Sequence, residues 1–131
     1  MRGKEWQHFY GNHKKAKAFL AAGVPVAAIC GATVGLALAG IIDERSHTGN
    51  SPAQLKATGY RGAACYQNQP AVTDGNLITA SGIAPIEFAY QVLKKLEVYT
   101  PEMLEAWYGL YKTGDPSYFF TLQKLVSGPN A

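Results

Sequence analysis

The pattern of apolar and polar positions is most informative between residues 18 and 42, where no side chain is charged. Gly23 and Pro25 interrupt this run. We expect a helix that ends at residue 22, because a glycine closes a helix in the left-handed conformation and a following proline cannot continue it. Residues 24–29 are apolar on both faces, which predicts a strand covered by helices on both sides of a parallel sheet.

Further helices and a hairpin are predicted along the rest of the chain. A helix is expected from about residue 33 to Gly40, and residues 60–66 are expected to form a strand. Asp74 and Gly75 stand between apolar pairs, a pattern typical of a tight hairpin. Four prolines in typical first-turn positions predict further helix starts: Pro52, Pro85, Pro101 and Pro116.

Composition and charge indicate one globular domain. The chain has 131 residues, of which 47% are hydrophobic and 16% charged, and its net charge is +3. Apart from Lys14, Lys15 and Lys17, the basic residues are scattered, whereas a nucleic-acid surface clusters them and interleaves aromatic rings. We therefore expect no nucleic-acid partner.

The uncharged run is long enough to cross a bilayer, so a membrane anchor is an alternative to the buried strand. The two breaks fit the ends of globular elements better than a continuous helix, and we expect no membrane segment. No apolar signal region precedes the run, which favours the cytoplasm. Cys30 and Cys65 are far apart and form no CxxC pair, so we expect neither a metal nor a cofactor.

Cys30 lies where the predicted strand gives way to a helix. It is the centre of the segment Ala-Ile-Cys-Gly-Ala, residues 28–32, in which the positions two before and two after the cysteine are small. This is the pattern of a nucleophile elbow, because a strand that enters a helix through one residue brings the flanking backbones close together. The central residue is then forced into a sparsely populated backbone conformation.

Such a position would favour a reactive thiol. Unpaired N–H groups and the helix dipole at the amino end of a helix stabilise an anion. The backbone N–H groups of Gly31 and Ala32 could then bind an oxyanion. The alternative is that Cys30 is a small buried hydrophobic residue. Cys65, inside a predicted strand, is expected to be structural.

The stretch Val-Ala-Ala-Ile-Cys-Gly-Ala-Thr, residues 26–33, resembles the nucleophile elbow of the ThiJ/PfpI family, within the class I glutamine amidotransferase-like superfamily. Residues 38–43, 45–50, 74–82 and 84–89 resemble the family pattern in order and spacing. The resemblance implies a flavodoxin-like three-layer α/β sandwich with a mostly parallel sheet. It also implies a cytoplasmic homodimer whose reactive centre is the elbow cysteine.

The chain departs from that family pattern around the cysteine. In the peptidase branch a histidine comes after the cysteine as its base, but here Gly31 takes that place, so peptidase activity is not expected. Some relatives carry a histidine near the thiol where this chain has Asn50. Thr33, His47 and Asn50 are the candidates for supporting residues around Cys30, and for His47, whose direction the sequence does not give, a surface or structural role is the favoured alternative.

The chain also departs from the family pattern at its front. Residues 2–6 resemble the family segment that begins at a Gly-Gly turn, so residues 1–126 are expected to form a partial domain that lacks about its first third. Residues 127–131 are expected to be a frayed tail. The acidic partner of the cysteine has no counterpart, and Glu5 is a poor substitute. Such a chain is a fragment, is completed by another chain, or associates with itself to cover exposed strand edges.

Two functions are compatible with these features. In the first, Cys30 attacks a small carbonyl or acyl substrate, as a hydrolase or a glyoxalase-like or deglycase-like enzyme does. In the second, the protein is a non-catalytic stress-response, chaperone-like or redox-sensing protein, which the missing acid favours.

Overall fold

The computed structural model describes residues 13–128. The expectations for residues 2–6, for Glu5 and for most of the predicted tail lie outside this range. The elements in chain order are α2 (His13–Ala21), β1 (Val26–Ile29), α3 (Gly31–Leu38), α4 (Pro52–Lys56), the 3-10 turn η1 (Ala63–Cys65), β2 (Ala71–Asp74), β3 (Leu77–Ala80), α5 (Pro85–Leu96), α6 (Pro101–Thr113) and α7 (Pro116–Ser127).

The described part of the chain contains one three-stranded sheet, in the order β1-β3-β2. β1 and β3 run parallel, with Val26 opposite Leu77. β2 and β3 are antiparallel and are joined by the predicted hairpin, in which Gly75 has a φ of 58°. The expectation of a mostly parallel sheet is therefore wrong for these three strands, because one pair is parallel and the other is antiparallel. A hairpin this short reverses the chain, so its second strand cannot run parallel to its first.

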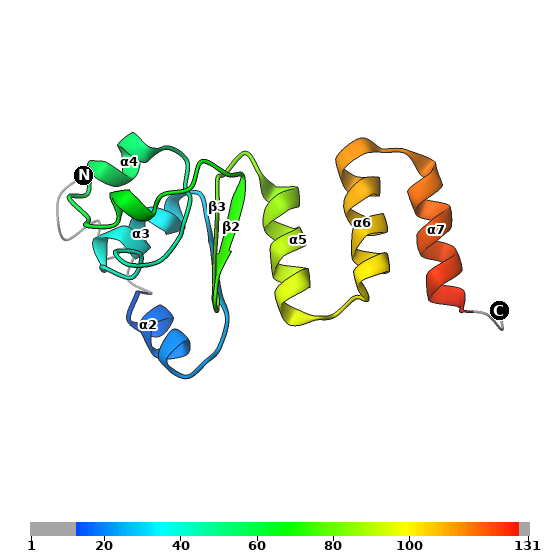
Figure 1. Ribbon diagram of the computed structural model, residues 1–131, viewed down its shortest axis with the longest axis horizontal. Coiled ribbons are helices and arrows are strands. Elements are labelled where there is room, and N and C mark those ends of the chain that lie inside the picture. The colour runs from blue at the N-terminus through cyan, green and yellow to red at the C-terminus, as the bar shows by residue number, and fades with distance from the viewer. Residues whose placement is uncertain (1–12, 129–131) are drawn as a thin grey trace.

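Helices cover both faces of the sheet (Figure 1). α2 and α3 lie on one side, α5 packs on the other, and α6 and α7 come after α5 in a row away from the sheet. All four residues of β3 are buried, as expected for the central strand. The core between the sheet and α3 includes Ile42, Leu55 and Leu77, each with no exposed surface. The protein is thus α/β with a small mixed sheet; a flavodoxin-like sandwich stays a prediction.

The predicted helix ends agree with the local chemistry. Ser51 accepts a hydrogen bond from a backbone N–H in the first turn of α4, and Thr100 and Asp115 cap α6 and α7 in the same way. α2 ends at Ala21, and Gly23 has the left-handed φ of 78° that the sequence predicted. These side chains satisfy N–H groups that a helix start leaves without partners.

The strand predicted over residues 60–66 is wrong. The segment contains η1, and only Tyr66 forms a single bridge, with His47. Gly62 packs so closely that an added Cβ would lie 2.3 Å from the carbonyl oxygen of Ile42. The N–H of Cys65 then donates to the Gly62 carbonyl at 2.9 Å, which closes a turn instead of extending the chain.

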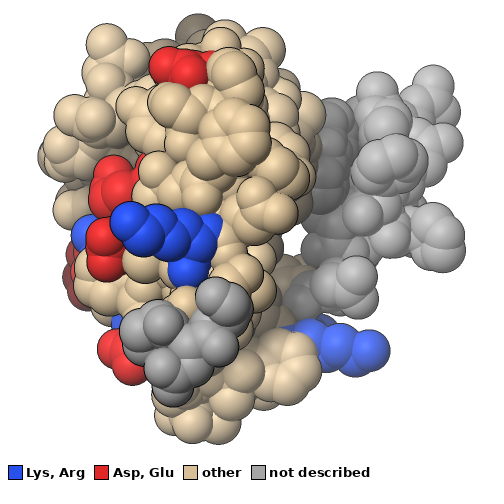
Figure 2. Space-filling view, turned by 90° about the vertical axis from the view of Figure 1, so that its right-hand side faces the viewer, with Lys and Arg blue, Asp and Glu red and all other residues tan. Residues whose placement is uncertain are grey.

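The end of the molecule formed by α7 carries exposed apolar side chains. Phe119, Phe120 and Val126 are 51%, 64% and 71% exposed. Figure 2 views the molecule from this side, and most of the described surface there is uncharged. Among residues 13–128, no helix has both the length and the apolar character needed to span a bilayer.

Candidate active site

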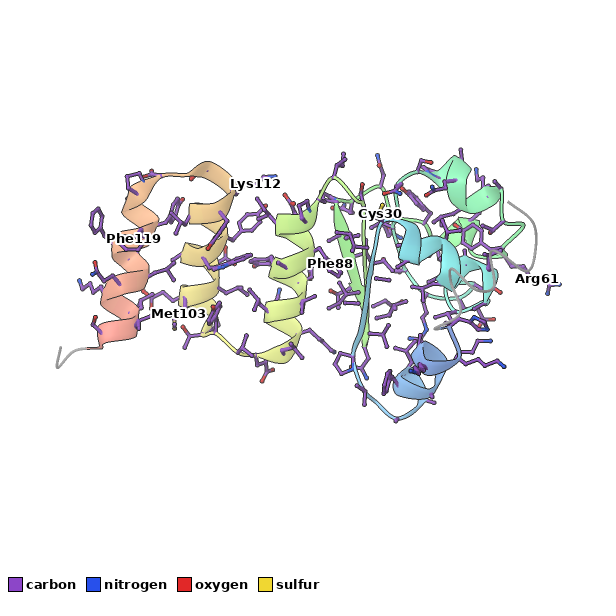
Figure 3. The ribbon with its side chains drawn as sticks, turned by 180° about the vertical axis from the view of Figure 1, so that it is seen from behind. Cys30, Arg61, Phe88, Met103, Lys112 and Phe119 are labelled. Atoms are coloured by element: carbon purple, nitrogen blue, oxygen red, sulfur yellow. The ribbon has the colours of Figure 1, made fainter. Side chains whose placement is uncertain are left out.

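Cys30 is the single residue that connects β1 to α3. Its φ of 58° and ψ of −126° lie in a region that side-chain-bearing residues rarely adopt. Its N–H donates to the Ala80 carbonyl at 3.1 Å, which continues the β1–β3 pairing up to the turn. The side chain is exposed at one end of the sheet (Figure 3). The predicted one-residue elbow is therefore present.

Thr33 secures this turn from within the helix. The side chain is fully buried, and its Oγ1 donates to the Cys30 carbonyl oxygen at 2.7 Å. The backbone N–H of Thr33 donates to the same oxygen at 3.1 Å. Thr33 thus contacts the backbone of Cys30 and stabilises the strained conformation.

The amino end of α3 supplies two further N–H groups. Gly31 and Ala32 precede Thr33, whose N–H makes the first hydrogen bond of this helix end. The N–H groups of the first residues of a helix have no partner inside it and favour a negative charge. Gly31 and Ala32 are therefore the first two residues of α3, and their role as oxyanion donors stays a prediction.

Asn50 is the side chain in polar contact with the thiol. Its Nδ2 lies 3.4 Å from the Cys30 Sγ, and its Oδ1 accepts a hydrogen bond from the Gly82 N–H at 2.8 Å. A backbone N–H can only donate, so the amide oxygen must face Gly82 and the NH₂ group must face the sulfur. Asn50 therefore acts as a donor to the thiol, a contact that stabilises a negative charge on sulfur more than a neutral thiol.

Gly82 leaves space beside the sulfur. A Cβ at this position would lie 2.9 Å from Sγ and 3.2 Å from the Asn50 Oδ1. The sequence patterns indicate no role for Gly82, because its importance depends on a close approach to Cys30, which is distant in the chain. The small residues around the elbow indicated the position of Cys30 in the sequence. A glycine on the neighbouring loop has no sequence pattern that would indicate its contact with the thiol.

His47 does not contact the thiol. The residue is fully buried, its Nδ1 lies 2.7 Å from the Arg45 carbonyl oxygen, and its Nε2 lies 2.9 Å from the Tyr60 hydroxyl. A carbonyl only accepts, so Nδ1 carries the proton and Tyr60 donates to Nε2. The ring also packs edge-on against Tyr60 and Tyr66. Both nitrogens are occupied, and His47 holds the loop before α4 in place.

Electrostatics around this buried cluster agree with a structural role. Burial, followed by the neighbouring Tyr66, raises the pKa of Tyr60, so its hydroxyl keeps its proton. Cys65 is half-buried nearby, and its Sγ lies 3.8 Å from the Asp43 carbonyl oxygen. Cys65 therefore lies in η1 and not in the predicted strand, and its structural role stays a prediction.

Among residues 13–128, no acidic or basic side chain is hydrogen-bonded to Cys30. Over the same range, no group of three or more His, Cys, Asp or Glu side chains could hold a metal ion. The groups that these residues bring to the site are therefore a thiol, an amide donor and backbone N–H groups.

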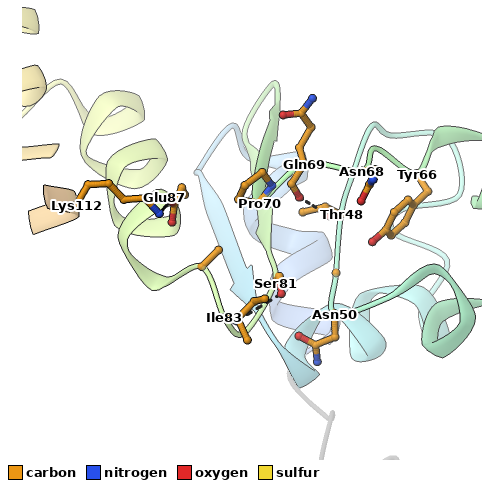
Figure 4. Close-up of a pocket in the computed structure, with 12 residues that line it drawn as sticks. Thr48, Asn50, Tyr66, Asn68, Gln69, Pro70, Ser81, Ile83, Glu87 and Lys112 are labelled. Carbon is orange, nitrogen blue, oxygen red and sulfur yellow. Dashed lines mark hydrogen bonds and ion pairs between the residues drawn. The ribbon is translucent and has the colours of Figure 1, made fainter. Parts of the chain in front are cut away.

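A pocket with a volume of about 340 Å³ is connected to the thiol through Asn50, which contacts the sulfur, although Cys30 itself does not line the pocket (Figure 4). Asn50 lines it, as do Ser81 and Ile83, which flank Gly82. Glu87 of α5 and Lys112 of α6 form an ion pair that also lines the pocket. The pocket is thus a potential binding site beside the elbow.

Comparison with known proteins gives consistent matches. Two curated relatives from Bacillus subtilis carry the names uncharacterized protease YoaZ and uncharacterized protease YdeA. YoaZ is 48% identical over 87% of this chain and 55% of its own length. YdeA is 40% identical over 71% of this chain and 52% of its own length. The chain therefore spans about half the length of these relatives.

Solved structures agree with this result. A thiJ/pfpI family protein from Bacillus anthracis is 49% identical, with a TM-score of 0.82 over 84% of this chain and 53% of its own. A DJ-1 superfamily protein from Agrobacterium tumefaciens is 40% identical, with a TM-score of 0.69 over 76% of this chain and 53% of its own. The sequence profile of the DJ-1/PfpI family matches residues 5–95, which include the elbow, Asn50 and Gly82. The chain belongs to the DJ-1/PfpI family.

Proposed function

We propose that Cys30 is a nucleophile that attacks the carbonyl carbon of a small carbonyl or acyl substrate. The observation that carries this proposal is the strained, positive-φ conformation of an exposed cysteine at the amino end of α3. Such a conformation costs on the order of 1–3 kcal/mol and persists where the surroundings enforce it, often at functional sites. Thr33 and the β1–β3 pairing enforce it here.

The reaction begins with addition of the thiolate. The sulfur lone pair forms an S–C bond, and the C=O π electrons move to the oxygen, which the N–H groups of Gly31 and Ala32 stabilise. With an aldehyde or ketone, the oxygen takes a proton from water and a hemithioacetal or hemithioketal results. With an ester or thioester, the C=O re-forms as the leaving group departs with the electron pair of its bond, and water then hydrolyses the acyl-thioester.

Activated substrates fit this site better than peptide bonds do. The Asn50 amide donates to the sulfur, so it cannot accept the thiol proton as a catalytic histidine would. An amine leaving group must also be protonated, and the described residues place no acid beside Cys30. We infer a hydrolase-like, glyoxalase-like or deglycase-like activity on small molecules. The word protease in the names of the two Bacillus subtilis relatives stays a statement about those proteins.

Trapping of the covalent intermediate tests this proposal. The chain is mixed with an activated acetyl ester, quenched in acid and digested, and the cysteine peptides are examined by mass spectrometry. We expect one acetyl group on the Cys30 peptide, a burst of released alcohol equal to the chain concentration, and loss of both in Cys30→Ser. Cys65→Ser is the matched control and should keep both. Acetylation of Cys65 alone would overturn the proposal.

A role as an oxidation sensor is the alternative, favoured by an exposed thiol with no acid or base in contact within residues 13–128. A sensor would gain oxygen at Cys30 in dilute peroxide, selectively over Cys65. It would also show no burst with the activated ester. The two measurements together therefore separate an enzyme from a sensor.

A further inference from the structure

The pocket beside the elbow has an uneven distribution of charge. Most of its lining groups are uncharged, including the amides of Asn68 and Gln69 and the phenol of Tyr66. Lys112 is the single cation among the described residues that line it, and Glu87 is the single anion. A ligand that enters this pocket therefore meets one ion pair in a mainly neutral, polar wall.

Lys112 is the accessible half of that pair. Its side chain is 49% exposed, whereas that of Glu87 is 17% exposed. An ammonium has three N–H groups, and Glu87 Oε1 accepts from one of them. Glu87 Oε1 also accepts weakly from the Tyr108 hydroxyl at 3.5 Å, so the carboxylate is held from two sides. The ion pair thus fixes the position of the lysine and leaves further ammonium N–H groups to bind a ligand.

Cys30 and Lys112 both lie toward the upper edge of the row of layers in Figure 3, with α5 between the sheet and α6. Asn50 joins the two regions, because its Nδ2 contacts the Cys30 sulfur and the residue lines the pocket. In Figure 4 the ion pair, with Glu87 on α5, stands on the opposite side of the pocket from Tyr66 and Asn68. A substrate held at Cys30 could therefore extend along the pocket toward Lys112.

We propose that this pocket selects substrates that carry a carboxylate remote from the reacting carbonyl, with Lys112 as the residue that binds the carboxylate. This inference rests on the proposed function, because it places the reacting carbon at Cys30. Glu87 positions Lys112 and also competes for it. The substrate class is thus a carboxylated aldehyde, ketone or ester.

A series of thiol-reactive maleimides tests the proposal without knowledge of the natural substrate. Each probe carries a carboxylate on a linker of one of several lengths, and its methyl ester is the neutral partner. The acid-to-ester ratio of reaction rates at Cys30 is read from peptide mass spectrometry, and the ratio at Cys65 in the same chain is the internal control. We expect the Cys30 ratio to peak at one linker length and to fall with added salt.

Variants of the ion pair give the decisive result. Lys112→Met should lower the peak ratio about two- to five-fold, the range for a single partly exposed ion pair. Glu87→Gln should raise it, because the lysine loses its competitor. A merely structural ion pair would shift both variants in the same direction. Lys94→Met, on the exposed side of α5 and outside the pocket, should leave the ratio unchanged.

Failure of this inference can be told from failure of the proposed function. If Cys30 reacts rapidly with every neutral probe but Lys112→Met leaves the acid-to-ester ratio unchanged, Lys112 does not bind the carboxylate, and the proposal that Cys30 is a nucleophile is unaffected. A fall of the ratio in Glu87→Gln also overturns it. If Cys30 reacts no faster than Cys65 with the neutral probes, the proposed function fails first.

Discussion

Among single residues, the proposed active site depends on one strained cysteine and three neighbours that hold it. Cys30 has a backbone conformation that costs free energy, Thr33 binds its carbonyl, Asn50 binds its sulfur and Gly82 leaves room for both. If the strain is retained for function, removing it should stabilise the fold and abolish the chemistry.

Cys30→Gly should raise the free energy of unfolding by about 1 kcal/mol relative to Cys30→Ala, because glycine adopts positive φ without a Cβ penalty. Urea denaturation of both variants measures this difference. Glu97→Gly against Glu97→Ala is the comparison, since Glu97 also has a positive φ, 53°, but lies in the left-handed helical region and is less strained. The prediction is contradicted if the free energy of unfolding rises less from alanine to glycine at position 30 than it does at position 97.

Gly82→Ala should slow alkylation of Cys30 while leaving that of Cys65 unchanged. The new Cβ would come within 2.9 Å of Sγ and 3.2 Å of the Asn50 oxygen, so the loop or the thiol must move. Peptide mass spectrometry after a timed iodoacetamide pulse measures both cysteines in one sample. Gly59→Ala is the control for strain alone, because its φ of 74° disfavours any side chain while nothing lies within 4 Å of its added Cβ. Equal rates in Gly82→Ala and the unmodified chain would refute the close approach.

The residues around the thiol were only partly predictable from sequence. Asn50 was expected near Cys30 from the family resemblance, and it contacts the sulfur. His47 was a second candidate, although a surface or structural role was favoured for it, and its ring in fact contacts Arg45 and Tyr60. Gly82 could not be found at all, because a contact between distant segments leaves no local pattern.

Among the helices and strands, local chemistry was a good guide where caps and periodicity agreed. The helices that begin after Ser51, Thr100 and Asp115 start at their predicted caps. The strand predicted over residues 60–66 failed because close packing at Gly62 overrode the local preference of its aromatic ends. Tertiary contacts of this kind cannot be read from the sequence of the segment itself.

The Glu87–Lys112 ion pair between α5 and α6 should stop stabilising the fold at acid pH. The hydrogen bond from Lys112 holds the pKa of Glu87 below its usual range. The unfolded chain therefore binds this proton more readily, so the ion pair stabilises the fold fully above the ordinary glutamate pKa of about 4.3. This stabilisation is lost as the pH falls through the lowered folded-state value.

Urea midpoints of the unmodified chain and Glu87→Gln should therefore differ at pH 7 and converge at acid pH, once Glu87 is protonated in the folded chain as well. Glu102→Gln, on the exposed first turn of α6, controls for the general loss of a carboxylate. A constant difference between the unmodified chain and Glu87→Gln at all pH values would show that packing, and not charge, links the two helices.

For the molecule as a whole, the most important exposed feature is the outer edge of β1, because its backbone hydrogen-bonding groups could pair with another strand. The N–H groups of Val26 and Cys30 point toward β3, so those of Ala27 and Ile29 point to the other edge. No strand pairs with that edge within residues 13–128. An open, apolar strand edge favours pairing with another chain, and the homo-oligomer predicted from the family resemblance is one way to cover it.

Self-association should therefore increase with concentration and weaken in Ala27→Pro. A proline removes one outward-pointing donor but none of the β1–β3 hydrogen bonds. Ala27→Val keeps the donor and favours strand structure, so it should associate as the unmodified chain does. Light scattering coupled to size exclusion gives the mass of each. A monomer at every concentration, or equal association in both variants, would refute pairing through this edge.

The sharpest test of Cys30 as a nucleophile is its rate of alkylation at pH 7 in the folded chain against the urea-unfolded chain, with Cys65 as the internal reference. The elbow, the amino end of α3 and the Asn50 amide should make Cys30 react faster in the folded chain than in the unfolded one, whereas the half-buried Cys65 should react more slowly when folded. Asn50→Ala should slow the reaction of folded Cys30 and leave that of Cys65 unchanged. If folding does not accelerate the reaction of Cys30, it is an ordinary exposed thiol and the proposed active site is wrong.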